Sequence, residues 1–298
     1  MNTRQATKVL LTTITLLTMY ACTPASPPVA PSQVQTIASQ TPQPTQTTAP
    51  LIDTATATPL TCLTETGRVD SGRLESTNPP QEYLIYLPPC YDQKTEEHYP
   101  VLYLLHGQTY TQDQWVRLGA VEIIDRLIQS GESLPFIVVF PDDRYWNLPP
   151  GPGFGQRLIE LIIPYIDENY RTLDDRDQRA IGGMSRGAGW ALRLGLTRWD
   201  LFSSIGLHSL AISQKDVSQL DNWLADIPDS SKLRVYMDIG DNDPELTMAG
   251  NIEAQFNEYG LLHEWHLYSG GHTEEYWSAH VEEYIQWYAA GWNKTHPE

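Results

Sequence analysis

The chain has 298 residues, of which 41% are hydrophobic, so it is long enough to bury a sizeable core in one large domain or two small ones. Its formal net charge is −18 at pH 7, and nearly all of its charged residues lie beyond residue 60. Nucleic acids and anionic lipid surfaces require a basic patch, so this acidic composition argues against both as direct partners of the body of the chain.

The first 22 residues have the pattern of an export signal. Arg4 and Lys8 precede the apolar run Val9–Ala21, which is short for a membrane span but typical of a signal peptide. The run leads into Cys22, and the stretch MYAC resembles the bacterial lipoprotein box, in which the cysteine is lipidated. We therefore expect an exported protein that contacts a membrane only through this anchor. The alternative is an ordinary cleaved signal and a secreted protein.

Residues 23–60 are rich in Pro, Thr, Ala, Ser and Gln, and they show no hydrophobic period. Such a segment cannot bury a core, and its proline content favours an extended conformation. We expect a disordered linker here, which would hold the following domain away from the anchor.

Two cysteines, Cys62 and Cys90, remain in the body of the chain. An even number of cysteines in an exported protein favours one disulfide, which would join the start of the domain to the end of the run EYLIYLPP. The alternative is a pair of buried free thiols. A metal site is disfavoured, because no CxxC or paired histidine spacing accompanies them.

From residue 61 onward, short apolar runs alternate with amphipathic stretches, which predicts one α/β domain over residues 61–298. The early strands follow one another directly, which favours antiparallel pairs. The later strands alternate with helices, which favours a mostly parallel central sheet with helices on both faces. The predicted strands are 68–75, 82–87, 101–105, 136–140, 179–182, 202–207, 233–239 and 264–268. The predicted helices are about 116–130, 155–169, 186–197, 215–225, 245–259 and 275–290.

Functional residues in open α/β sheets gather beyond the carboxyl ends of the strands. Four predicted strands end in polar sequences, namely LLHGQTYTQDQW, GGMSRG, DIGDNDPE and SGGHTEEYW. A serine, several acidic residues and a histidine are therefore expected along one edge of the sheet.

The sequence GMSRG, residues 183–187, fits the pattern G-x-S-x-G between a predicted strand and a predicted helix. This is the nucleophile elbow, a strained turn that exposes the serine hydroxyl, here that of Ser185. Its glycines avoid clashes where strand and helix cross, and the helix that follows directs its positive end toward the site. The alternative is an ordinary glycine-rich turn.

A serine hydroxyl needs a base to take its proton, and the base needs an acid to orient it. His272 is the candidate base, because it follows a predicted strand and a Gly-Gly turn. Asp243 is the preferred acid and Asp241 the second choice, whereas Asp238 is expected within the strand 233–239. The order Ser, Asp, His is that of α/β-hydrolases. A calcium loop in DIGDNDPE is disfavoured, because the EF-hand spacing and glycine are absent.

The oxyanion of the reaction needs backbone N–H donors, which we expect from Arg186 and from Gln108, just beyond His106 and Gly107. The side chain of Arg186 is expected to make only a surface ion pair. His106 is expected to shape its loop, and His208 either lines the pocket or only packs.

The segments VLYLLHGQTYTQDQW, AIGGMSRGAGWAL, GDNDPEL and GGHTEEYW together resemble the putative-esterase family of α/β-hydrolases. That family includes feruloyl and acetyl-xylan esterases, S-formylglutathione hydrolase, enterochelin esterases and mycolyltransferases. The resemblance covers about residues 68–290 and implies the α/β-hydrolase fold. The family's acid follows a G-x-x-D pattern, which matches Asp243. Its histidine follows Gly-Gly and precedes an aromatic residue, which matches His272 and Trp277.

The leading hypothesis is an exported serine esterase that works through an acyl-enzyme and requires neither a metal nor an organic cofactor. An acyltransferase with the same triad is the first alternative, and a non-catalytic surface-binding module on the same fold is the second. Tyr145 and Trp146, in the loop 141–155, could stack on a sugar or a phenolic acyl group, or could pack the loop onto the domain. Trp277 carries the same two interpretations. A carbohydrate-linked or aromatic ester is the preferred small-molecule substrate.

Overall fold

The computed structural model describes residues 61–143, 153–231 and 233–293, all within one compact unit, Ala57–Glu298. The expected export signal, the lipidation site Cys22 and the linker lie outside the described residues, as do Tyr145 and Trp146. Within the described ranges, no helix combines the length and the apolar composition that crossing a bilayer requires.

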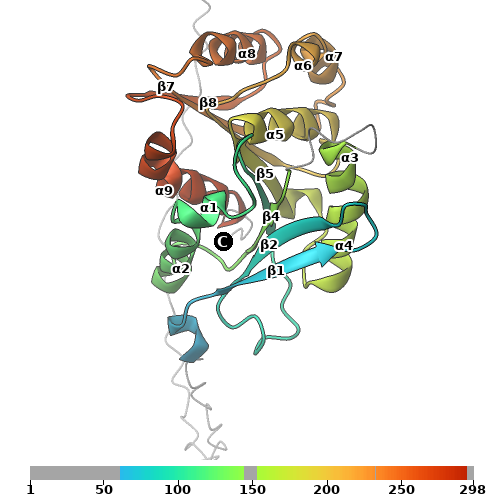
Figure 1. Cartoon of the computed structure of the whole chain (residues 1–298), viewed down its shortest axis with the longest axis vertical. Helices are drawn as coiled ribbons and strands as arrows, with labels where there is room; N and C mark the ends of the chain where they lie inside the picture. Colours follow the sequence, from blue (N-terminus) through green and yellow to red (C-terminus); the bar gives the residue numbers. More distant parts are fainter. Residues whose placement is uncertain (1–60, 144–152, 232, 294–298) are drawn as a thin grey trace, which may run out of the picture. The chain divides into compact units, whose positions relative to one another are not determined.

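One mixed sheet of eight strands forms the centre of the unit (Figure 1). The strands are β1 Arg68–Leu74, β2 Gln81–Leu87, β3 Val101–Leu105, β4 Ile137–Pro141, β5 Arg179–Met184, β6 Ser204–His208, β7 Arg234–Gly240 and β8 His263–Tyr268. Their order is β1-β2-β4-β3-β5-β6-β7-β8. The pairs β1–β2 and β2–β4 are antiparallel, and the other neighbours are parallel. All eight predicted strands are confirmed to within two residues at each end.

Three predicted helices are confirmed to within two residues, namely α5 Arg186–Thr197, α8 Leu246–Glu258 and α9 Glu274–Trp292. The other three are divided into shorter pieces. These are α1 Gln114–Arg117 with α2 Ala120–Ser130; α3 Phe154–Arg157, the π-helix η3 Leu158–Ile162 and α4 Ile163–Asn169; and α6 Gln214–Val217 with α7 Leu220–Ala225. Gly119 accounts for the first break, because its φ of 92° lies in the left-handed region that ends a right-handed helix.

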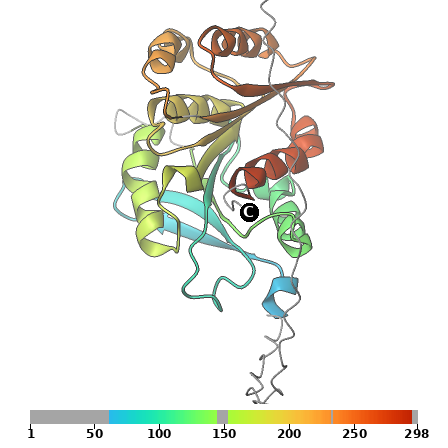
Figure 2. The same ribbon diagram turned by 180° about the vertical axis from the view of Figure 1, so that it is seen from behind.

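Helices cover both faces of the sheet, as predicted. In β3, Val101 and Tyr103 pack into a core shared with α4, α5 and α8, whereas Leu102 and Leu104 pack into a core shared with α2 and α9. Successive side chains of a strand point to opposite faces of the sheet. Because both faces are buried here, every residue of β3 is apolar. Figures 1 and 2 show α2 and α9 together on one side of the sheet, with α4 and α5 on the other.

A disulfide joins Cys62 to Cys90, with the two Cα atoms 5.1 Å apart. Cys62 belongs to the short 3-10 helix η1 Thr61–Thr64, and Cys90 follows β2. The predicted bridge is therefore present in the structure, and the alternative of two free thiols is wrong. The bond fastens the first described turn of the chain to the antiparallel end of the sheet.

Candidate active site

Ser185 lies in a tight turn between β5 and α5. Its backbone has φ 56° and ψ −122°, a left-handed conformation that is costly for a residue other than glycine. The two glycines of the motif are required by close backbone contacts. A Cβ on Gly183 would lie 2.4 Å from the carbonyl carbon of Gly187, and one on Gly187 would lie 2.3 Å from the carbonyl oxygen of Leu105. The strand, the turn and the helix therefore present Ser185 at the carboxyl end of the central strand.

His272 and Asp243 approach Ser185 from the loops after β8 and β7. The Nε2 atom of His272 lies 2.7 Å from Ser185 Oγ, and its Nδ1 atom lies 2.9 Å from Oδ2 of Asp243. A carboxylate can only accept hydrogen bonds, so Nδ1 carries the proton and Nε2 is left to accept from the serine hydroxyl. The three side chains form one continuous hydrogen-bonded chain.

The geometry selects Asp243 rather than Asp241 as the neighbour of His272. Asp241 instead accepts hydrogen bonds from Asn242 and from the backbone N–H of Gly270, so it shapes the loop that leads to the histidine.

Among the described residues, no group of three or more His, Cys, Asp or Glu side chains is arranged to hold a metal ion.

The carboxyl group of Asp243 is fully buried but well supplied with hydrogen-bond donors. Burial alone would raise its pKa, yet hydrogen bonds from His272, the Glu245 N–H and the Ser209 hydroxyl lower it below the usual range. Ser209 in turn accepts a hydrogen bond of 2.9 Å from Trp277 Nε1. No sequence motif marks Ser209, and its position after β6 was its only signal.

Trp277 is almost fully buried behind His272, with the two rings edge to face and their centroids 5.2 Å apart. It therefore supports the histidine and does not present a stacking face to a substrate. The expectation that Trp277 contacts substrate is corrected by this burial.

His208 is also a core residue. It is fully buried, with Nδ1 2.7 Å from Asp238 and Nε2 2.9 Å from the hydroxyl of Tyr288, and it stacks on Tyr284. The expectation that His208 lines the pocket is wrong, and the packing alternative holds, because α9 covers this end of β6. Its backbone oxygen accepts a 2.8 Å hydrogen bond from the N–H of Ser185, so it supports the elbow. Asp238 lies within β7, as predicted.

The two expected oxyanion donors come from different elements. Arg186 is the first residue of α5, and Gln108 lies in the loop after β3. That loop is close to the elbow, since a Cβ on Gly107 would lie 3.7 Å from Ser185 Cβ. The side-chain oxygen of Gln114 accepts a 2.8 Å hydrogen bond from the N–H of Gly107 and so holds the loop in place.

The side chain of Arg186 does not make the expected surface ion pair. It pairs with Asp143, whose carboxyl group is only 4% exposed, two residues after β4. Asp143 also accepts a 2.8 Å hydrogen bond from Trp190 Nε1. Burial raises the pKa of Asp143 to about 6, against the opposing effects of Arg186, His106 and Trp190. Sequence reasoning missed Asp143 because nothing local distinguishes it from Asp142.

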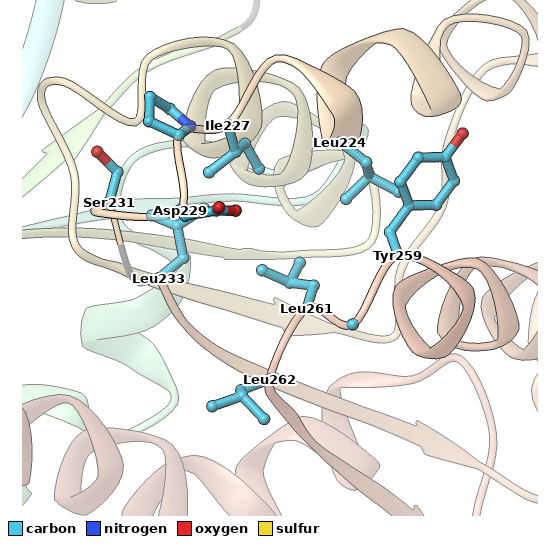
Figure 3. A pocket seen from close by; sticks show the side chains of 10 residues that line it. Leu224, Ile227, Asp229, Ser231, Leu233, Tyr259, Leu261 and Leu262 are labelled. Atoms are coloured by element: carbon cyan, nitrogen blue, oxygen red, sulfur yellow. The ribbon is translucent and has the colours of Figure 1, made fainter.

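A cavity of about 440 Å³ opens beside the elbow. Its lining comes from α5, from the loop after β3, from the segment before α6 and from α6 itself: Gln108, Arg186, Gly189, Trp190, Arg193, Ala211, Ile212, Ser213 and Asp216. A second cavity, of about 260 Å³, lies between α7, the start of β7 and the end of α8 (Figure 3), and none of the candidate catalytic residues lines it. Of these two cavities, the first is therefore the one that adjoins the elbow, through Gln108 and Arg186.

The chain is similar in sequence to known esterases. The chain is 35% identical over 146 residues to an endo-1,4-beta-xylanase/feruloyl esterase of Xylanibacter ruminicola, an alignment that covers 45% of this chain and 20% of that protein. It is 33% identical over 134 residues to an esterase of Mycobacterium tuberculosis, covering 42% of this chain and 28% of that protein. The chain thus spans less than a third of the length of each of these relatives.

Solved structures extend the similarity to the whole fold. A ferulic acid esterase superimposes with a TM-score of 0.68 at 26% identity, over 76% of this chain and 100% of that one. An S-formylglutathione hydrolase of Staphylococcus aureus superimposes with a TM-score of 0.61 at 17% identity, over 74% of this chain and 98% of that one, which supports the fold alone. The family model described as putative esterase matches residues 75–287. The chain therefore belongs to the putative-esterase family and has the α/β-hydrolase fold.

Proposed function

We propose that this protein is a serine esterase in which Ser185 is the nucleophile, His272 the general base and Asp243 the acid that orients it. The observation that carries the proposal is the hydrogen-bonded chain of 2.7 Å and 2.9 Å that joins these three side chains at the carboxyl end of the sheet. Membership of an esterase family supports the same chemistry.

In the first half of the reaction, Ser185 Oγ attacks the ester carbonyl carbon while its proton passes to His272 Nε2. The π electrons of the carbonyl move to its oxygen, and the N–H groups of Gln108 and Arg186 donate hydrogen bonds to this oxyanion. The intermediate then collapses and the bond to the alcohol oxygen breaks. The alcohol leaves with the proton from His272, and Ser185 remains acylated.

In the second half, His272 Nε2 takes a proton from water, and the water oxygen bonds to the acyl carbon. The bond between the acyl carbon and Ser185 Oγ then breaks, and the proton on His272 returns to the serine. Asp243 stays ionised throughout and stabilises the imidazolium, a role that its lowered pKa suits.

The proposed substrates are carbohydrate-linked or aromatic esters. Proteins named as feruloyl or ferulic acid esterases are similar to this chain in sequence and in structure. The cavity beside the elbow offers the indole of Trp190 and the side chain of Ile212 as apolar surface. Tyr145 and Trp146, which lie outside the described residues, remain proposed contacts of the bound group.

The test is hydrolysis of p-nitrophenyl acetate and methyl ferulate by the full chain, together with labelling by a fluorophosphonate probe. We expect turnover of at least the acetate, and a probe adduct on Ser185 identified by peptide mass spectrometry. A chain that hydrolyses neither ester and carries no adduct would be a binding module on this fold. An adduct on another serine would overturn the assignment of the nucleophile.

We also propose that the protein is exported and anchored by a lipid on Cys22, with residues 23–60 as the spacer. The disulfide between Cys62 and Cys90 supports export, since such bonds persist in oxidising compartments. Cys22→Ser should abolish incorporation of labelled palmitate and move the protein from the membrane fraction to the soluble fraction, because lipidation requires the thiol. Ser185→Ala keeps Cys22 and should label as the wild type does. Wild-type chain without label would mean a simply cleaved signal.

A further inference from the structure

The two proposed oxyanion donors are separated in the chain and lie on different elements, so their common geometry needs a physical cause. One is the N–H of Arg186 at the start of α5, and the other is the N–H of Gln108 after β3. Asp143, after β4, is hydrogen-bonded to a neighbour of each donor. Its partners are the side chain of Arg186 and the side chain of His106, which lies two residues before Gln108. Asp143 is 3% exposed. Among the hydrogen bonds of the described residues, none joins it to a side chain of the triad.

The first connection runs through the carboxyl group of Asp143. Its Oδ2 atom accepts hydrogen bonds from the guanidinium of Arg186 and from Trp190 Nε1, both on the first turns of α5. Charge-assisted hydrogen bonds of this kind are stronger and more directional than neutral ones. The pair therefore fixes the rotation of the helix start, and with it the direction of the backbone N–H of Arg186.

The second connection runs through the backbone of Asp143. Its N–H donates a 2.7 Å hydrogen bond to His106 Nε2, so the ring proton of His106 is on Nδ1. That Nδ1–H donates to the carbonyl oxygen of Gly107, at 2.7 Å. This carbonyl and the N–H of Gln108 belong to the same planar peptide unit, so fixing the direction of one fixes the other.

We propose that Asp143 is the positioning residue of the oxyanion hole, holding the Arg186 N–H through its carboxylate and the Gln108 N–H through its own backbone N–H and His106. The inference rests on the proposed function, because it assigns a cause to the placement of those two donors. Asp143 does not touch the substrate in this role and acts only through its neighbours.

The charge on Asp143 makes the first connection sensitive to pH. The titratable and charged groups that face it are Arg186 on α5, His106 after β3, Arg157 on α3 and the adjacent Asp142. Burial raises the pKa of Asp143 to about 6, so the carboxyl group takes up a proton as the pH falls through this value. The neutral form no longer holds the guanidinium by charge, so the rate should fall on the acid side.

The experiment compares kcat and KM of three full-length proteins: the wild type, Asp143→Ala and Asp143→Asn. The concentration of active sites used to calculate kcat is determined by titration with a fluorophosphonate. We expect Asp143→Ala to lower kcat about 10- to 100-fold, with KM nearly unchanged, because it releases the Arg186 N–H, which acts mainly in the transition state, whereas the backbone N–H that leads to Gln108 is kept. Asp143→Asn keeps the shape but not the charge, and it should remove the component of the acid limb near pH 6. The rate of fluorophosphonate labelling should fall in parallel.

A double-mutant cycle tests the path through Arg186. Arg186→Gln keeps the backbone N–H, so its effect should be similar to that of Asp143→Ala, and the two together should cost little more than either alone. The matched control is Asp167→Asn. It breaks another ion pair between an aspartate and a buried arginine, in this case Arg179 at the opposite end of β5. It should lower stability without changing kcat.

The outcomes separate the two proposals. If the wild type hydrolyses the ester and Asp143→Ala keeps kcat within about twofold, the inference is wrong and the esterase function stands. Equal losses in Asp143→Ala and Asp167→Asn would also refute it, because they would reflect folding only. If the wild type neither turns over nor reacts with the probe, both proposals fail.

Discussion

Ser185→Ala should lower kcat for p-nitrophenyl acetate by about 10⁶-fold, the size of the loss seen when the nucleophile of a triad is removed. The elbow should remain folded, because its glycines and the hydrogen bond from the Ser185 N–H to His208 do not involve the hydroxyl. Initial rates and circular dichroism spectra of both proteins are the measurements.

The control for this substitution is Ser130→Ala, which removes an exposed hydroxyl near the end of α2. It should retain the wild-type rate. After subtraction of the uncatalysed hydrolysis of the activated ester, turnover by Ser185→Ala within tenfold of the wild type would contradict the proposed nucleophile.

Asp243→Asn should lower kcat by about 10⁴-fold, the effect known for this change in a Ser-His-Asp triad. The amide can donate a hydrogen bond to Nδ1 of His272, which favours the tautomer with the proton on Nε2. That tautomer cannot accept the proton of Ser185, although the geometry is nearly unchanged. The measurement is the pre-steady-state rate of acylation by p-nitrophenyl acetate.

Asp241→Asn is the matched control, because Asp241 is two residues away and has no hydrogen bond to His272 among the described residues. It should retain most of the activity. Similar losses for the two substitutions would show that the loop after β7 matters only as a whole, and Asp243 would lose its assigned role.

The elements that the sequence predicts well are those specified by local patterns. The strands are buried apolar runs bounded by turn residues, and the G-x-S-x-G turn between a strand and a helix is itself a local signal. The pattern of residues 116–130 predicts one continuous helix, and a single glycine does not contradict such a pattern, since one glycine is tolerated in many helices. The break at Gly119 depends on the backbone conformation that the fold imposes there.

The parts of the site that the sequence does not predict depend on distant contacts. His208 is buried by Tyr288, 80 residues later, and Asp143 meets Arg186 43 residues later. Ser209 meets Trp277 68 residues later. Each of these side chains has an equally plausible surface role when only its neighbours in sequence are considered, so only the packing of α5 and α9 distinguishes them.

β8 is one of the two edge strands of the sheet and is hydrogen-bonded to β7 alone, whereas β5 has β3 and β6 on its two sides. The proposed nucleophile is thus carried by a central strand and the proposed base by a peripheral one. Proteins open in sub-global steps that require less free energy than complete unfolding, and a sheet margin is a natural place for such a step. Detachment of β8 would remove His272 and leave the elbow folded. We therefore expect heat or denaturant to abolish activity through the loss of this one margin of the sheet, before the rest of the sheet unfolds.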